Sequence, residues 1–309
     1  MYNGVIIVNK EAGFTSHDVV AKLRGILKQK KIGHTGTLDP DAIGVLPVCL
    51  GHATKLCDML TDKDKTYEAV MLLGRVTDTQ DTSGKTIAES DVKTLMESGK
   101  LTNEKIIEAI QSFIGEYHQI PPMYSALKVN GKKLYELARE GIEVERKARQ
   151  VFINSIEDIS IDFQRVTMTV SCSKGTYIRT LCHDIGEKLG CGACMDKLKR
   201  TRVSTFTIEN ALKLNEINDI VAMDCGIEKH IVTVEKIFES YRVANTKPEF
   251  DRLIYNGNSL NVNMVELQDN IAVEDKESVR MYDSNKKFMG IFIYSKKDKM
   301  FKVEKMFLN

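Results

Sequence analysis

Residues 33–55 have the sequence GHTGTLDPDAIGVLPVCLGHATK, and the rest of this 309-residue chain is organised around them. They hold four glycines and two of the chain's five prolines, which disfavours both a regular helix and a central strand. Gly33 and Gly36 bracket His34 with residues that are free to take positive φ. Pro40 restricts Asp39 to extended backbone conformations. The sequence therefore predicts a rigid, irregular loop that holds the Asp39 carboxylate at a defined angle.

Asp39 has two interpretations. An Asp-Pro pair commonly initiates a simple turn, whereas a long loop with this many special backbone positions usually carries function. The stretch also resembles G-H-x-G-T-L-D-P-x-A-x-G-V-L-P-V-x-x-G-x-A-T-K, the signature of the TruB-type tRNA pseudouridine synthases. That resemblance implies that Asp39 is a catalytic nucleophile. It also implies that His34 occupies the space left by a base flipped out of its RNA loop.

Three further motifs resemble the same family. The sequence KTYEA at 65–69 is similar to a strand whose tyrosine, here Tyr67, faces the target uracil, although a strand tyrosine is usually core. The sequence SKGTYIR at 173–179 is similar to the second signature, in which the arginine (Arg179) pairs with the nucleophile and the tyrosine (Tyr177) lines the base pocket. On an extended chain these two side chains would project on the same side. In a third signature, Leu198 packs against the base.

The net charge is only +1, but the basic residues are clustered. A solvated surface would explain any one cluster, whereas several clusters beside glycine-rich, aromatic loops favour binding to a phosphate backbone. Residues 119–135 combine prolines, aromatic residues and lysines; they could form a plain hairpin, but they resemble the family's inserted RNA-gripping segment. We expect RNA-backbone contacts from Lys128, Lys132, Lys133, Lys199, Arg200 and Arg202.

The composition, 42% hydrophobic and 28% charged, is ordinary for a soluble globular protein. No apolar run approaches the ~20 residues that cross a bilayer, and the N-terminus lacks the features of a signal peptide. We therefore expect a cytoplasmic protein that is not bound to a membrane. The seven cysteines include Cys191 and Cys194 at C-x-x-C spacing, which would allow a zinc site, but no second spaced pair follows. We expect reduced thiols, no metal and no cofactor.

Hydrophobic patterns indicate an α+β fold. Strands are expected at 4–10, 65–74 and 164–171, and helices from Ser16 or Thr15 to Leu27, at 52–60, 103–114 and 184–189. Beyond 240 the pattern changes to short strands, such as 271–273, 279–282 and 288–294. The family resemblance implies a large mixed, mainly antiparallel sheet with flanking helices. It places a catalytic domain at 1–240, an RNA-gripping insertion at about 116–150, and a small β-rich PUA-like RNA-binding domain at 241–309.

The activity that this resemblance implies is the isomerisation of a uridine in the T-loop of tRNA to pseudouridine, by a monomer that needs no obligatory protein partner. A guide-RNA-dependent pseudouridine synthase would share the signatures, but it would usually be longer and more basic. A non-catalytic tRNA-binding or tRNA-folding protein would not require an Asp39–Arg179 pair. A retaining glycosidase would require two flanking carboxylates, and only one is framed by a signature. A zinc hydrolase would rest on Cys191 and Cys194 alone.

Overall fold

The computed structural model describes residues 1–129, 131–267 and 272–307. One large sheet is built from strands between residues 4 and 232. Its strands lie in the order β14-β1-β3-β12-β4-β11-β10-β7, with β2 paired to β3 and β13 paired to β12. Only the β3–β12 pairing is parallel, so the expected mixed, mainly antiparallel sheet is confirmed. The strands are β1 (Gly4–Lys10), β2 (Ile32–His34), β3 (Ile43–Leu50), β4 (Lys65–Leu73), β7 (Gly115–Gln119), β10 (Arg149–Asp162), β11 (Arg165–Cys172), β12 (Ala193–Val203), β13 (Phe206–Thr207) and β14 (Ile231–Val232).

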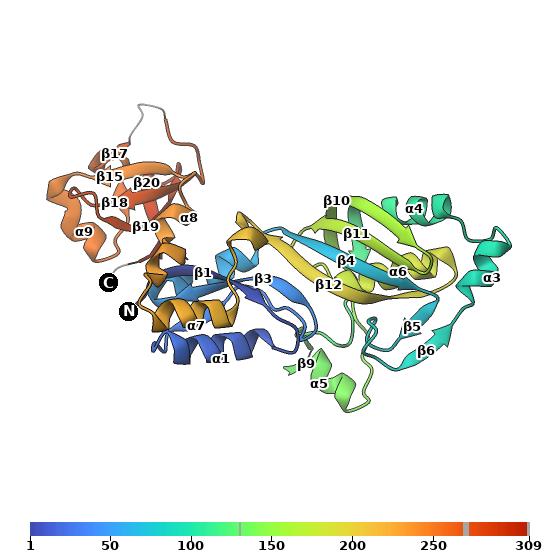
Figure 1. Cartoon of the computed structure of the whole chain (residues 1–309). Helices are drawn as coiled ribbons and strands as arrows, with labels where there is room; N and C mark the ends of the chain where they lie inside the picture. The colour runs from blue at the N-terminus through green and yellow to red at the C-terminus, as the bar shows by residue number, and fades with distance from the viewer. Residues whose placement is uncertain (130, 268–271, 308–309) are drawn as a thin grey trace.

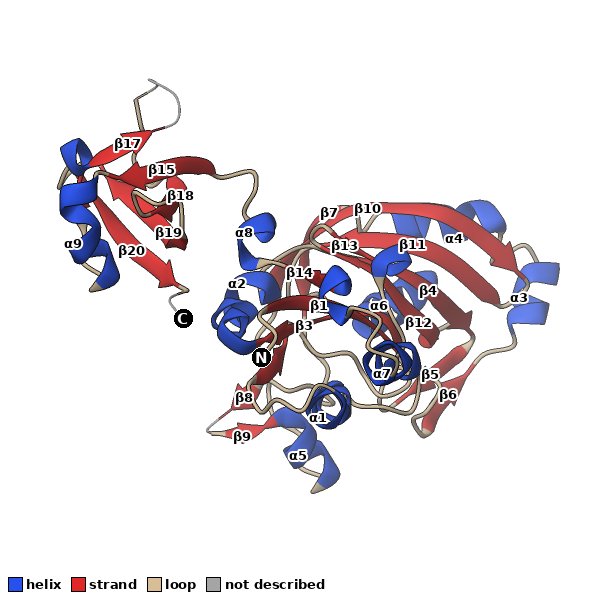
Figure 2. Ribbon diagram, turned by 60° about the vertical axis from the view of Figure 1, so that its left-hand side comes forward, coloured by secondary structure: helices blue, strands red, loops and turns tan. Residues whose placement is uncertain are grey.

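A second sheet of six strands forms a β-rich C-terminal domain, which lies at one end of the large sheet in Figures 1 and 2. Its order is β16-β20-β19-β18-β15-β17. Its strands are β15 (Arg242–Thr246), β16 (Leu260–Asn261), β17 (Val265–Leu267), β18 (Ser278–Tyr282), β19 (Phe288–Ser295) and β20 (Met300–Met306). Two small hairpins project from the large sheet, namely β5 (Arg75–Thr77) with β6 (Thr86–Glu89), and β8 (Lys128–Val129) with β9 (Lys132–Lys133).

The helices of the described residues cover both sheets. They are α1 (Ser16–Ile26), α2 (Cys57–Thr61), α3 (Val92–Glu97), α4 (Asn103–Gln111), α5 (Leu134–Arg139), α6 (Ile178–Leu189), α7 (Leu214–Ala222), α8 (Val234–Ile237) and α9 (Asp251–Tyr255). The first helix begins as expected, because Thr15 and Asp18 form a reciprocal capping box. None of the described helices is long and apolar enough to cross a membrane.

Strand β1 is apolar on both sides because both of its faces are covered. Ile6 and Val8 pack in the cluster beneath α1 and α7, while Val5 and Ile7 pack in a cluster that includes residues of α2 and of the C-terminal domain. A continuous apolar run is the pattern expected for a strand that is buried on both faces. The opposite part of the sheet, built from β4, β11 and β12, packs against α4 and α6 in a third cluster.

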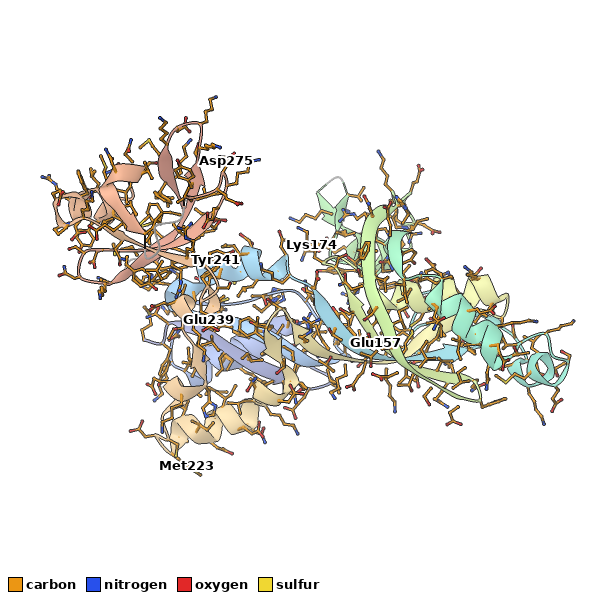
Figure 3. The ribbon with its side chains drawn as sticks, turned by 90° about the horizontal axis from the view of Figure 1, so that it is seen from above. Glu157, Lys174, Met223, Glu239, Tyr241 and Asp275 are labelled. Atoms are coloured by element: carbon orange, nitrogen blue, oxygen red, sulfur yellow. The ribbon has the colours of Figure 1, made fainter. Side chains whose placement is uncertain are left out.

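The C-terminal domain is joined to the large sheet by apolar contacts. Ile291 and Phe307 share a cluster with Leu56 and Leu60, which lie just beyond β3. The Lys55 ammonium also donates a hydrogen bond to the Met306 carbonyl, at 2.8 Å. Figure 3 labels Glu239 and Tyr241 at this junction, and the Arg280 guanidinium donates to the carbonyls of both. The junction is therefore packed, and it lies directly behind the segment that follows β3.

Pro47 contradicts the expectation of an irregular loop in the stretch 33–55, because it lies within β3. In a strand, the N–H and C=O of one residue point to the same side, and the Pro47 carbonyl accepts from the Thr35 N–H, at 3.1 Å. On that side β2 pairs only with Val48–Leu50, and β12 pairs only with Ile43 and Gly44. The missing N–H of Pro47 therefore faces the gap between two neighbouring strands, where no ladder hydrogen bond is lost.

Other sequence predictions also need correction. Residues 52–60 are not one helix but a 3₁₀ helix over Gly51–Leu56 followed by α2. Helix α6 begins at Ile178, so Arg179 lies on its first turn and not on an extended chain with Tyr177. Of the strand expected at 271–273, residue 271 lies outside the described residues, and residues 272 and 273 form no strand. Of the two glycines expected to be free to take positive φ, Gly36 has φ +76°, whereas the φ of Gly33 is not positive.

Candidate active site

Asp39 lies in the loop between β2 and β3, and the loop is fixed on both sides of it. The side chains of Leu38 and Ala42 are buried in the core beneath β4 and α6. The Ser16 hydroxyl, at the start of α1, accepts the Leu38 N–H at 3.0 Å. The Pro40 carbonyl accepts the Gly13 N–H at 3.0 Å. The predicted rigid presentation of the Asp39 carboxylate therefore follows from contacts between this loop and the turn that precedes α1.

Lys10 supports the same loop from the end of β1. Its ammonium is fully buried and donates to three carbonyls, those of Glu11 (3.0 Å), Phe14 (2.7 Å) and Pro40 (2.8 Å). Burial lowers the pKa of this ammonium to about 8, although the nearby carboxylates of Asp41 and Asp39 oppose the shift. Three acceptors satisfy all three donors of the ammonium, which explains how a lysine can lie in the interior here.

Arg179 holds the Asp39 carboxylate through two atoms. Its Nε lies 2.9 Å from Asp39 Oδ2, and its Nη2 donates to Oδ1 at 3.3 Å. A bidentate pair of this kind sets both the position and the angle of the carboxylate. The Arg179 side chain is 6% exposed, whereas that of Asp39 is 40% exposed. The arginine is therefore a buried support, and the carboxylate that it holds is open to a ligand.

The same guanidinium also binds two other segments. Its Nη1 donates to the Thr79 carbonyl at 3.0 Å, and its Nη2 donates to the Tyr124 carbonyl at 2.9 Å. A second carboxylate, that of Asp81, lies 3.7 Å from Nη1. Sequence reasoning assigned no chemistry to residues 77–84. The polar sequence TDTQDTSG at 77–84 was the only indication of a functional loop here. That Asp81 lies close to Arg179 is shown by the fold alone.

The pKa of Asp39 is raised from its ordinary value. Burial of the carboxyl among protein atoms is the main cause, and the Asp81 carboxylate adds to it. The Arg179 guanidinium opposes the shift without cancelling it. Because the 40% exposed side chain keeps contact with water, the pair with Arg179 acts chiefly to orient Asp39 rather than to acidify it.

Tyr67 and Leu198 lie on neighbouring strands of the large sheet. Leu198 of β12 is the register partner of Ala69 on β4, two residues after Tyr67. Tyr67 is buried, and burial raises the pKa of its hydroxyl although the Arg200 guanidinium beside it has the opposite effect. Leu198 is partly buried against the same core as Leu38. Both side chains therefore belong to, or pack against, the same apolar cluster as Leu38 of the Asp39 loop.

Tyr177 is the N-cap residue of α6, two residues before Arg179, and its side chain makes no capping hydrogen bond. The side chain of Gln119, at the end of β7, binds the Tyr177 backbone twice: Oε1 accepts the N–H at 2.8 Å, and Nε2 donates to the carbonyl at 2.9 Å. Burial raises the pKa of the Tyr177 hydroxyl, and the charge of Asp39 contributes in the same direction. Gln119 was not singled out by sequence reasoning, yet it fixes this turn.

His34 lies at the end of β2, five residues before Asp39. Its ring packs edge-on against His17 of α1, with 5.2 Å between ring centroids. Burial lowers the pKa of His34, and the positive charge of Arg200 acts in the same direction. His34 is therefore a neutral aromatic ring at pH 7, which is suited to stacking against bases.

The lysines and arginines expected to contact RNA separate into two groups. Arg200 is 1% exposed and donates to the carbonyls of Val45 (2.7 Å) and Gly36 (3.5 Å), so its expected RNA-backbone contact is wrong. Arg200 has a structural role, because it donates to two carbonyls, of Val45 and Gly36, that have no partner on a neighbouring strand. Lys199 is paired with Glu68 at 3.2 Å, and Arg202 binds Thr66 and Ser204. The remaining candidates lie on the β8–β9 hairpin: Lys128, Lys132 and Lys133.

The cysteines give no metal site among the described residues, where no group of three or more His, Cys, Asp or Glu side chains is placed to hold an ion. Cys191 and Cys194 are both buried free thiols, as is Cys182. Burial raises the pKa of the Cys194 thiol to about 11, so it is protonated at neutral pH.

Comparisons with known proteins agree with this geometry. The model of the TruB family pseudouridylate synthase N-terminal domain matches residues 24–178, and that of the tRNA pseudouridylate synthase B C-terminal domain matches residues 179–249. The tRNA pseudouridine synthase B of Lachnoclostridium phytofermentans is 51% identical, covering 99% of this chain and 100% of that protein. The protein of the same name from Clostridium perfringens strain 13 is 45% identical, covering 99% of each.

Solved structures show the same fold. A chain of a Cbf5-Nop10-Gar1 complex is 29% identical, with a TM-score of 0.71 over 99% of this chain and 85% of that one. A chain of an H/ACA RNP bound to a substrate RNA containing 2'-deoxyuridine is 27% identical, with a TM-score of 0.72 over the same shares. Because family models match residues 24–249 and the fold is shared over almost the whole length, this chain belongs to the TruB family of pseudouridylate synthases, which are isomerases.

Proposed function

We propose that this protein converts a specific uridine in the T-loop of tRNA to pseudouridine, with Asp39 as the nucleophile. The observation that carries the proposal is the bidentate Asp39–Arg179 pair, in which a buried arginine presents a carboxylate that stays 40% exposed. The names of the relatives at 45–51% identity support tRNA as the substrate. The reaction breaks the bond between sugar and base nitrogen and forms a bond to base carbon, so no atoms are gained or lost.

The surrounding residues have separate roles in this proposal. His34, a neutral ring at the edge of the loop, fills the space that the flipped uridine leaves. Tyr67 and Tyr177 flank the freed uracil, and Leu198 closes the apolar wall. Arg179 orients Asp39 and also binds Thr79 and Tyr124, so it couples the nucleophile to two neighbouring loops.

RNA affinity comes from other parts of the chain. We infer that residues 1–240 are the catalytic domain, with an RNA-gripping insertion at about 116–150 that contacts phosphates through Lys128, Lys132 and Lys133. Residues 241–309 act as a PUA-like RNA-binding domain, and Lys199 and Arg202 add contacts beside the active site. The protein acts in the cytoplasm as a monomer and needs no obligatory protein partner.

A guide-RNA-dependent synthase is the second candidate, favoured by the structural likeness to a chain of an H/ACA RNP. One experiment separates the two. The purified chain is incubated with an unmodified tRNA transcript, without guide RNA or other proteins, and pseudouridine is mapped by position. We expect one modified uridine in the T-loop. A product that forms only with a guide RNA and partner proteins would support the second candidate, and binding without product in both conditions would contradict both.

A further inference from the structure

Two of the seven cysteines lie next to each other where β2, β3 and α2 meet. Cys49 is a buried residue of β3, and Cys57, which is partly buried, is the first residue of α2. Cys49 belongs to the apolar cluster that also contains Ile291 and Phe307 of the C-terminal domain, and Cys57 packs against that cluster. Neither thiol has a role in the proposed reaction.

Gly33 allows the two sulfur atoms to approach each other. It is the register partner of Cys49 in the antiparallel pair of β2 and β3, so a side chain at Gly33 would lie on the same face as that of Cys49. The two Cβ atoms would be about 4.5–5.5 Å apart. A Cβ built on Gly33 would lie 3.1 Å from Cys57 Sγ. The Cys57 sulfur therefore lies in the space of the missing side chain, opposite Cys49, and the two thiols share a hydrogen bond.

This contact makes the two thiols chemically different. The hydrogen bond from the Cys49 thiol lowers the pKa of Cys57, although burial and the Asp58 carboxylate oppose the shift. The same hydrogen bond raises the pKa of Cys49, and burial adds to the effect. Because the thiolate is the reactive form of cysteine, Cys57 is suited to attack an oxidant. Cys49 stays protonated beside it and is suited to resolve the product.

A second pair of neighbouring thiols in the same protein differs in these respects. Cys182 of α6 lies near enough to Cys194 of β12 for their charges to interact. Both are buried, and burial raises the pKa of both thiols. This pair therefore has proximity without a partly exposed thiol of lowered pKa, and it serves as an internal comparison for the reactivity of Cys49 and Cys57.

A disulfide between Cys49 and Cys57 would displace α2. A covalent bond draws together two sulfur atoms that are in non-bonded contact, so one of the two backbone segments must move. Cys49 is held by strand pairing on both sides, with β1 and with β2. The movement therefore falls on the segment around Cys57. That segment carries Leu56 and Leu60, which pack in the same cluster as residues of the C-terminal domain.

We propose that Cys49 and Cys57 form a redox-sensitive pair that a peroxide oxidises to a disulfide, and that the disulfide weakens tRNA binding by displacing α2 from the C-terminal domain. The second half rests on the proposed RNA-binding role of residues 241–309. The chemistry needs one peroxide and two steps, and a thiol reductant reverses it.

In the first step, the Cys57 thiolate attacks one peroxide oxygen and becomes a sulfenic acid. The O–O bond breaks, and the other oxygen leaves as hydroxide, which takes up the proton that Cys57 had released. In the second step, the Cys49 sulfur attacks the Cys57 sulfur and loses its own proton. The S–S bond forms, and the sulfenic hydroxyl leaves with that proton as a second water. The pair thus gives two electrons to one peroxide.

Hydrogen peroxide is the probe for the first half of the proposal. The full chain is treated at neutral pH, free thiols are alkylated, and disulfides are mapped by mass spectrometry. We expect a Cys49–Cys57 disulfide that dithiothreitol reverses, with Cys182 and Cys194 left reduced. Cys225→Ser changes an exposed thiol outside the pair and should form the same disulfide. A folded wild type that forms no Cys49–Cys57 disulfide, or that oxidises Cys182 and Cys194 equally fast, would overturn the proposal.

Two variants test the order of the steps. In Cys49→Ala the sulfenic acid of Cys57 has no thiol to resolve it, so dimedone should capture it on Cys57. In Cys57→Ser, which changes a partly exposed side chain, Cys49 should stay reduced. Oxidation of Cys49 in folded Cys57→Ser would contradict the assignment of Cys57 as the attacking thiol, whether or not Cys49→Ala folds.

The second half is tested by the affinity for tRNA before and after oxidation. Oxidised wild type should bind more weakly, with a salt slope smaller by about one for each lost phosphate contact. Dithiothreitol should restore the affinity, and peroxide-treated Cys57→Ser should keep it. A disulfide that forms without a change in affinity would overturn the coupling to the C-terminal domain. Failure of the proposed function is seen separately, as reduced wild type that binds tRNA without forming pseudouridine.

Discussion

At the scale of single residues, Arg179 makes more contacts than an ion pair requires. It binds both oxygens of Asp39, two carbonyls from other loops, and lies near Asp81. The two carbonyls hold the guanidinium even when the charge on Asp39 is absent. Substitution of Asp39 should therefore change the chemistry more than it changes the structure.

Asp39→Asn should retain nearly the full affinity for tRNA, because neutralisation of phosphates and not one carboxylate dominates such binding. It should form no detectable pseudouridine, whereas loss of a proton-transfer group alone would cost about 10²–10⁴ in rate. The affinity for tRNA, the pseudouridine yield and the melting temperature are measured on the same preparation of Asp39→Asn. Asp41→Asn, an exposed carboxylate two residues away, is the control and should remain active. Residual turnover of a few per cent in Asp39→Asn would exclude it as the nucleophile.

The raised pKa of Asp39 predicts the pH dependence of the reaction. The nucleophile must be ionised, so the single-turnover rate should fall as pH decreases through a pKa above the ordinary value of about 3.9. Because the Asp81 carboxylate raises that pKa, Asp81→Asn should move the acid limb of the profile to lower pH. The measurement is the rate at saturating enzyme from about pH 4 to pH 8. A limb that stays in place or moves to higher pH would contradict the assignment.

At the scale of elements, the close approach of β3 to β12 explains two unusual residues. Gly44 has φ +105°, and a Cβ built on it would lie 2.2 Å from the Arg200 carbonyl oxygen. Beyond this point the strands diverge, and the buried Arg200 side chain donates to the Val45 carbonyl instead of a neighbouring strand. The same divergence leaves room for Pro47. One glycine and one buried arginine thus shape the sheet behind the Asp39 loop.

Gly44→Ala should therefore destabilise the protein strongly. Gly99→Ala is the matched comparison, because Gly99 also has positive φ, +69°, but a Cβ there would meet no atom within 4 Å. The Gly99 variant should lose about 1–2 kcal/mol, the cost of left-handed backbone for a residue with a side chain. The Gly44 variant must in addition move two backbones apart, so its loss should be larger. Denaturant unfolding of both variants measures the difference, and equal losses would contradict the steric explanation.

At the scale of the whole molecule, the packed junction changes the expectation for a shortened chain. A protein that ends at Ser240 should bind tRNA more weakly, since each lost phosphate contact lowers the salt slope by about one. Its single-turnover rate at saturating enzyme should stay close to that of the full chain, because the catalytic groups precede residue 240. It should also melt at a lower temperature, because Leu56 and Leu60 lose the cover of Ile291 and Phe307.

Full-length Phe307→Ala separates the two effects of this truncation. It removes packing at the junction and should lower the melting temperature while the salt slope stays that of wild type. A truncated protein that folds but has lost its single-turnover rate would show that the C-terminal domain shapes the active site.

The sequence by itself determined the local features of this protein. It predicted a fixed loop around Asp39 through Asp39-Pro40, a cap of α1 at Ser16 or Thr15, and strands through their apolar periodicity. Each depends on residues close together in the chain, where spacing and backbone preference suffice. The motif match with the TruB family added Arg179 as a partner for Asp39.

Only the tertiary structure decided which distant residues meet. Arg179 reaches Asp39 across 140 positions, and at the same guanidinium it brings in Asp81, which no local pattern distinguished from other loop acids. Arg200 looked like a surface cation because its neighbours in sequence are basic, but the carbonyls left open by diverging strands draw it into the interior. Burial and strand divergence are properties of the packed sheet. They set the pKa of Asp39 and the place of Pro47, and neither is contained in the spacing of residues along the chain.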